Sequence, residues 1–198
     1  MLFSIAATIY LATATSTVIV IFPALLLLCG WFGERIIERR FARPEEDSTM
    51  NKTDLKTIGS YSLVAVAGTF IMGYAIQNVH LFSTVEGMQL STIDSLLYTV
   101  LIAVAEEEFF RGFTTEALLN IKFPARFGFI NSTPFIPLLL SAALFCGYHF
   151  ARYGTNPDAL LYVFAGGFVL SFVAWKSRRI SPTMLGHVLN NILSFIGV

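Results

Sequence analysis

The sequence predicts an all-α protein, a polytopic bundle of about six helices that cross a membrane. Of its 198 residues, 55% are hydrophobic and only 13% are charged, against roughly 25% charged residues in an ordinary soluble domain. The mean hydropathy is +0.68. The polar residues are also spaced so that they leave apolar runs of about 20 residues, the length that crosses a hydrocarbon core.

Six segments have the composition of such spans, five of them of full length and one short. In chain order they are residues 2–32, 57–79, 93–119, 135–150, 159–175 and 182–198. The first lacks the basic start and the cleavage site of a signal peptide, so we expect a retained helix. We expect one integral membrane domain, with two spans and a polar cytoplasmic connection in 1–92 and a helical core in 93–198.

Basic residues are distributed unevenly among the connections between these spans. Eleven lie in the first, third and fifth connections, and one, Arg152, lies in the fourth. Because basic loops stay in the cytoplasm, both termini are predicted to be non-cytoplasmic. We expect the membrane to be a bacterial inner (plasma) membrane. The first connection is predicted to begin as a helix, at residues 34–40. A net charge of zero argues against a nucleic-acid partner.

The third span contains Ala-Glu-Glu-Glu-Phe-Phe-Arg-Gly, residues 105–112, within an otherwise apolar run. Each charged side chain at the centre of a membrane helix costs about 2.5–3.5 kcal/mol, so this group must face protein or water. On an α-helix, Glu107 and Arg111 are four residues apart and can neutralise each other. Glu108 could share Arg111 or line the mouth of a cavity, whereas Glu106 needs a partner from another helix.

Two later spans carry polar residues at compatible depths. His149 lies in the fourth span, and His187 and Asn191 lie one turn apart in the sixth. A carboxylate beside an imidazole can act as a general base on water, and a second imidazole with a carboxamide can donate to an oxyanion. Together with Glu106, these are the parts of an amide hydrolase without a covalent nucleophile. Glu106, His149 and His187 could instead bind zinc, although no His-Glu-x-x-His helix is present.

These residues form three motifs that resemble, in order, those of the CAAX protease and bacteriocin-processing (CPBP) family, also called Abi: Glu106-Glu107-x-x-x-Arg111, Phe145-x-x-x-His149 and His187-x-x-x-Asn191. The resemblance covers about residues 93–198, and the family includes the type II prenyl-protein endopeptidases. It implies an intramembrane endopeptidase of glutamic type, in which Glu106 and His149 activate water. His187 and Asn191 would stabilise the oxyanion.

The resemblance also assigns supporting roles to Glu107 and Arg111, in a conical cavity between the third, fourth and sixth spans. Glu108 departs from the family pattern, where this position is usually apolar. The implied partners are a peptide or membrane-protein substrate and the lipid bilayer, and no cofactor is expected, with zinc as the alternative. Nothing in the sequence shows that the substrate is prenylated.

Three other interpretations compete with the protease. The protein could be a non-enzymatic bacteriocin self-immunity factor or a membrane scaffold of the same fold. It could be a small transporter that uses the buried carboxylates as a proton relay. Each polar group could also have only a structural role, as an ion pair or as a hydrogen bond between helices.

Overall fold

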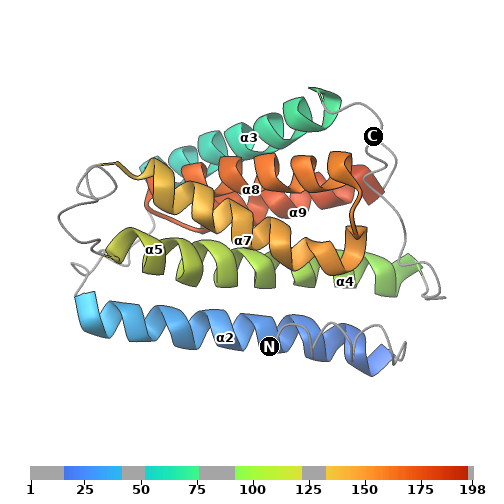
Figure 1. The fold of residues 1–198 in the computed structure, drawn as a ribbon, viewed down its shortest axis with the longest axis horizontal. Helices are drawn as coiled ribbons and strands as arrows, with labels where there is room; N and C mark the ends of the chain where they lie inside the picture. The colour runs from blue at the N-terminus through green and yellow to red at the C-terminus, as the bar shows by residue number, and fades with distance from the viewer. Residues whose placement is uncertain (1–15, 42–51, 76–91, 122–132, 196–198) are drawn as a thin grey trace.

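The computed structural model describes residues 16–41, 52–75, 92–121 and 133–195, and within these ranges it contains helices and no strand (Figure 1). The all-α prediction is therefore confirmed for the described part of the chain. The helices are α2 (Ser16–Phe41), α3 (Lys52–Ala75), α4 (Thr92–Glu107), the π-helix η1 (Glu108–Thr115), α5 (Glu116–Asn120), α7 (Phe135–Tyr153), α8 (Pro157–Ser177) and α9 (Ser181–Phe195).

Several predicted boundaries agree with these helices. The third predicted span, 93–119, corresponds to α4, η1 and α5, which follow one another without a break, and the fifth, 159–175, lies within α8. The α8 helix begins where the side chain of Asn156 accepts hydrogen bonds from the backbone N–H groups of Asp158 and Ala159, a common N-cap arrangement. The helical start predicted for the first polar connection is also present, because α2 continues to Phe41.

Two of the described helices, α7 and α8, combine the length and the apolar composition that a membrane crossing requires. The exposed side of α7 is correspondingly apolar, with Phe135, Leu139 and Leu144 each more than 40% exposed. Such a stripe fits a surface that faces lipid rather than water. The first, second and last predicted spans lie partly outside the described residues, so the count of six crossings stays a prediction.

The α4–η1–α5 segment occupies the middle of the bundle. It lies between α2 on one side and α7, α8 and α9 on the other, while α3 packs on α8 and α9 (Figure 1). The contact with α2 is close at Gly30, where a Cβ atom would lie 2.9 Å from the backbone carbonyl carbon of Glu108. Real Cβ atoms do not approach so near, so this position requires glycine. The central segment is therefore enclosed by other helices, and its polar side chains can be buried.

Candidate active site

The first acidic motif lies where the central segment changes from an α-helix to a π-helix. Glu106 and Glu107 end α4, and η1 begins at Glu108. The hydroxyl groups of Thr114 and Thr115 donate to backbone carbonyls five residues earlier, at 2.9 and 2.8 Å. A regular α-helix through this motif is therefore a wrong prediction. The α-helical periodicity of the apolar residues gives no sign of the wider turn, and π-helical turns are rare but frequent at functional sites.

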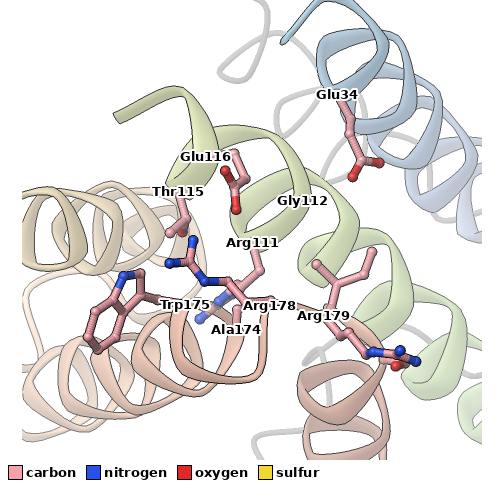
Figure 2. Close-up of a pocket in the computed structure, with 11 residues that line it drawn as sticks. Glu34, Arg111, Gly112, Thr115, Glu116, Ala174, Trp175, Arg178 and Arg179 are labelled. Atoms are coloured by element: carbon pink, nitrogen blue, oxygen red, sulfur yellow. The ribbon is translucent and has the colours of Figure 1, made fainter. Parts of the chain in front are cut away.

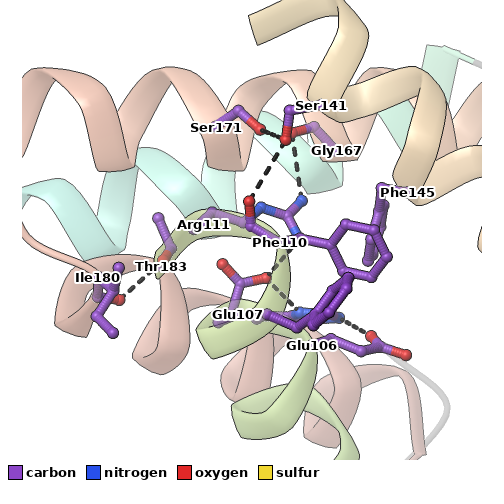
Figure 3. Close-up of polar contacts among 12 residues, drawn as sticks. Glu106, Glu107, Phe110, Arg111, Ser141, Phe145, Gly167, Ser171, Ile180 and Thr183 are labelled. Carbon is purple, nitrogen blue, oxygen red and sulfur yellow. Dashed lines mark hydrogen bonds and ion pairs between the residues drawn. The ribbon is translucent and has the colours of Figure 1, made fainter. Parts of the chain in front are cut away.

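Glu107 is completely buried, and one of its oxygens makes both an ion pair and a hydrogen bond. Its Oε1 atom lies 3.0 Å from Nη1 of Arg111 and 2.8 Å from Nδ1 of His187 (Figure 3). The predicted contact with Arg111 is present. The contact with His187 was not predicted, because it depends on how α9 is rotated against α4. Glu107 therefore fixes the orientation of an imidazole on another helix.

Arg111 extends the same group of contacts to α7 and α8. Its Nη2 atom donates to the carbonyl oxygen of Gly167 at 3.2 Å, and its guanidinium carbon lies 4.2 Å from the ring centroid of Phe145. Next to it, the hydroxyl group of Ser141 lies 2.7 Å from that of Thr115 and accepts from that of Ser171 (Figure 3). The buried charge is thus enclosed by aromatic and hydroxyl groups.

Glu106 is 5% exposed and lies between two histidines. One oxygen is 3.9 Å from Nε2 of His149, and the other is 3.8 Å from Nε2 of His187. Three helices, α4, α7 and α9, therefore bring Glu106 and both predicted histidines together. Both distances exceed a direct hydrogen bond.

The hydrogen bonds of the two histidines determine which nitrogen of each ring faces Glu106. Nδ1 of His149 lies 2.9 Å from the carbonyl oxygen of Phe145, which can only accept, so Nδ1 carries the hydrogen. Nδ1 of His187 faces the carboxylate of Glu107 and donates for the same reason. In neutral imidazoles the other nitrogen is then an acceptor. Both acceptor nitrogens point toward Glu106.

Aromatic rings surround His149 on α7 itself. The centroid of its ring lies 4.4 Å from that of Phe145, 5.0 Å from that of Tyr148 and 6.0 Å from that of Tyr153, which is nearly parallel to it. These contacts, with the hydrogen bond to the Phe145 carbonyl, hold the imidazole in one orientation. Nothing in the sequence indicates that the rings of Tyr148 and Tyr153 belong to the site.

The two consecutive asparagines of α9 have different surroundings. Asn191, the predicted oxyanion donor, is half-buried and makes no hydrogen bond with a residue that the structure describes. Asn190 is buried, accepts from the hydroxyl of Thr69 at 3.1 Å and donates to that of Tyr162 at 3.3 Å. Asn190 therefore joins α3, α8 and α9. The spacing of four residues from His187 indicates Asn191, and nothing in the sequence indicates Asn190.

Glu108 lies on the α2 side of the central segment. Its carboxyl carbon would be 3.7 Å from a Cβ atom at Gly112, and its backbone packs against Gly30. The side chain is 8% exposed. Glu108 therefore faces α2, whereas the Glu106 carboxylate lies between α7 and α9.

The residues predicted as the alternative zinc ligands, Glu106 and the two histidines, lie farther apart than the ligands of a bound zinc ion. Two ligands of a tetrahedral zinc ion, each about 2.0–2.1 Å from the metal, lie about 3.3 Å apart. Here the ligand atoms of Glu106 and each histidine are 3.8 and 3.9 Å apart. Among the described residues, no group of three or more His, Cys, Asp or Glu is arranged to hold a metal ion.

The described helices form a bundle that encloses a carboxylate between two histidines. A family model, that of the type II CAAX prenyl endopeptidase Rce1-like proteins, matches residues 88–193. The match covers more than half of the chain, and the chain belongs to this family, whose members are membrane proteins. The matched segment includes Glu106, His149, His187 and Asn191. Comparisons with curated proteins and with solved structures found no match.

Proposed function

We propose that the protein is an intramembrane endopeptidase of glutamic type, in which Glu106 and His149 activate the water that cleaves a peptide bond. The observation that carries the proposal is the placement of the Glu106 carboxylate 3.9 Å from Nε2 of His149 and 3.8 Å from Nε2 of His187. A polar separation near 3.9 Å suits a bridging water better than direct contact. A water there can donate one hydrogen to Glu106 and the other to His149.

Cleavage then follows as general base catalysis. The water oxygen attacks the carbonyl carbon of the substrate while its proton passes to Glu106 or His149. The carbonyl oxygen becomes an oxyanion, and the same proton is later delivered to the leaving amine. The products are a carboxylic acid and an amine, and no covalent bond to the enzyme forms.

The second histidine has a distinct role in this proposal. Because Nδ1 of His187 donates to Glu107, its Nε2 atom can donate to an oxyanion only when the ring is protonated. Asn191, on the same side of α9 one turn later, supplies the second donor to the oxyanion.

The proposed substrate is a peptide or protein associated with the membrane, the class that the family suggests. Whether a prenyl group is needed can be tested with one peptide in prenylated and unprenylated forms. A pull-down with Glu106→Ala, which should bind substrate without cleaving it, would identify natural substrates. A substrate found in this way would then be assayed with the wild-type protein.

Glu106→Gln is expected to lower kcat at least about 100-fold, the lower limit for loss of a general base, while the protein still accumulates in the membrane. Asp158→Asn is the matched control and should cleave normally, because Asp158 is an exposed carboxylate in the first turn of α8. Normal cleavage by Glu106→Gln would disprove the mechanism. If the protein is a bacteriocin self-immunity factor or a scaffold, Glu106→Gln should still protect the cell or bind its partner. If the protein is a transporter, proton-coupled uptake should occur without a cleaved product.

We also propose that the reaction needs no metal. Purified active protein is expected to contain less than stoichiometric zinc, and chelator treatment should leave the cleavage rate unchanged. Stoichiometric zinc, together with loss of activity that added zinc restores, would favour the metal-dependent alternative.

A further inference from the structure

A second polar site lies on the other side of Arg111. A pocket of about 310 Å³ opens where α2, η1, α8 and the turn between α8 and α9 meet (Figure 2). None of Glu106, Glu107, His149 and His187 lines it. Its volume falls within the range of small-ligand sites.

The pocket presents charges of both signs. Two carboxylates, those of Glu34 and Glu116, come from α2 and α5, and two guanidinium groups besides that of Arg111, those of Arg178 and Arg179, come from the turn that follows α8 (Figure 2). The first residue of α9, Ser181, also lines the pocket, so the positive end of that helix dipole lies at the wall. This mixture suits a ligand that itself carries both charges.

Two of these opposite charges have no partner among the residues that the structure describes. Within the described part of the chain, the side chains of Glu34 and Arg178 make no hydrogen bond or ion pair, either with each other or with another residue. Arg178 also has a φ of 59°, a left-handed conformation that is uncommon for a residue with a side chain. This conformation ends α8 and leaves the Arg178 side chain at the pocket.

Both tryptophans of the chain lie close to the pocket. Trp175 lines it, and Trp31 lies one turn before Glu34 on α2. A basic side chain lies over each ring, Arg35 at 5.5 Å from Trp31 and Lys176 at 5.8 Å from Trp175. Tryptophan and basic residues are enriched where a membrane protein meets the lipid head groups. These residues favour a position of the pocket at the level of the head groups, at the end of α8.

We propose that this pocket binds the head group of an amino-phospholipid, in which a phosphate is joined to a primary ammonium, as in phosphatidylethanolamine. Arg178 and the start of α9 would bind the phosphate, because guanidinium groups and helix N-termini both favour that anion. Glu34 would accept hydrogen bonds from the ammonium. A choline head group has no N–H to donate, and a glycerol head group has no positive charge for Glu34.

The test is native mass spectrometry of the full-length protein in detergent, titrated with phosphatidylethanolamine, phosphatidylcholine and phosphatidylglycerol that have identical acyl chains. Wild-type protein should bind phosphatidylethanolamine about tenfold more tightly than the other two, the effect of one charge-assisted hydrogen bond. Arg178→Gln and Glu34→Gln should each weaken this binding by a similar factor. Glu34→Gln should also remove the preference over phosphatidylglycerol.

Lys176→Gln is the matched control, because Lys176 is an exposed cation at the same helix end that does not line the pocket. It should bind phosphatidylethanolamine as the wild type does. Equal binding of the three lipids by the wild type, or an equal loss in Lys176→Gln and Arg178→Gln, would overturn the proposal. If Arg178→Gln does not fold, Arg178→Lys provides the same comparison, with a smaller expected loss.

Competition by soluble compounds distinguishes a zwitterion site from a simple anion site. An excess of phosphoethanolamine should displace the bound lipid, while inorganic phosphate at the same concentration should not. Displacement by phosphate alone would show an anion site without an ammonium contact and would contradict the proposal. Failure of phosphoethanolamine to displace the lipid would contradict it as well.

Discussion

One oxygen atom of Glu107 connects the arginine of its own helix to a histidine of α9. At 3.0 Å from Arg111 and 2.8 Å from His187, it neutralises one partner and orients the other. The two effects can be separated by mutation, because stability should depend on the charge pair whereas, in the proposed mechanism, catalysis depends on the imidazole.

Glu107→Gln should leave the Arg111 charge buried without a counter-charge and lower the free energy of unfolding by about 3–5 kcal/mol. The double variant Glu107→Gln/Arg111→Met removes that charge and should regain most of the loss. It should still cleave slowly, because His187 has lost the carboxylate that orients its ring. Thermal unfolding in detergent and a cleavage assay measure the two effects. Wild-type cleavage by the double variant would contradict the role proposed for Glu107.

The neighbouring asparagines are expected to respond differently to the same substitution. Asn190→Ala removes hydrogen bonds to Thr69 and Tyr162 and should lower the free energy of unfolding by about 1–3 kcal/mol. Asn191→Ala should leave stability nearly unchanged and lower kcat by about 10²–10³ through loss of an oxyanion donor. Thermal unfolding and kcat measured on both variants test this contrast. The reverse pattern would assign the oxyanion contact to Asn190.

At the scale of helices, η1 depends on its contact with α2. Gly30 allows the two backbones to meet near Glu108, so the π-helical turn is held from the side opposite the histidines. This contact involves backbone atoms, and a side chain cannot simply rotate away to make room.

Gly30→Ala is therefore expected to lower the free energy of unfolding by about 1–3 kcal/mol, as overpacking does. It should also reduce cleavage, since Glu106 and Glu107 immediately precede the displaced turn. Gly59→Ala in α3 is the matched control, because a Cβ atom there would meet nothing within 4 Å. Melting temperatures of the two variants in the same detergent provide the measurement. Equal melting temperatures would show that the α2 contact does not constrain η1.

At the scale of the whole molecule, the predicted orientation places the turn between α7 and α8 outside the cytoplasm and the end of α8 inside it. Single cysteines at Asp158 and Lys176, in a background with Cys29→Ser and Cys146→Ala, should react with an impermeant maleimide from opposite sides. In intact cells only Asp158→Cys should be labelled, and Lys176→Cys should react only after permeabilisation. Labelling in the opposite sense would reverse the predicted topology.

The sequence predicts the helices of this molecule better than their contacts. Apolar runs gave the extent of the central segment and of α8 within a few residues, because burial in lipid imposes length and composition on each helix separately. The convergence of Glu106, His149 and His187 was also inferred, since charges in such a helix need partners. The Glu107–His187 contact and the bonds of Asn190 depend on helix rotation, which spacing along one chain does not determine.

The π-helical turn also has a consequence for changes in chain length. Each residue of a helix adds a fixed rotation about its axis, about 100° in an α-helix and less in the wider π-helical turn, so removing one residue between Glu108 and Arg111 would rotate Arg111 and everything beyond it relative to Glu107. Arg111 could then no longer face both Glu107 and Gly167. Many substitutions in the segment would instead leave the rotation of the helix about its axis unchanged. The segment should therefore tolerate changes of side chain far better than insertions or deletions.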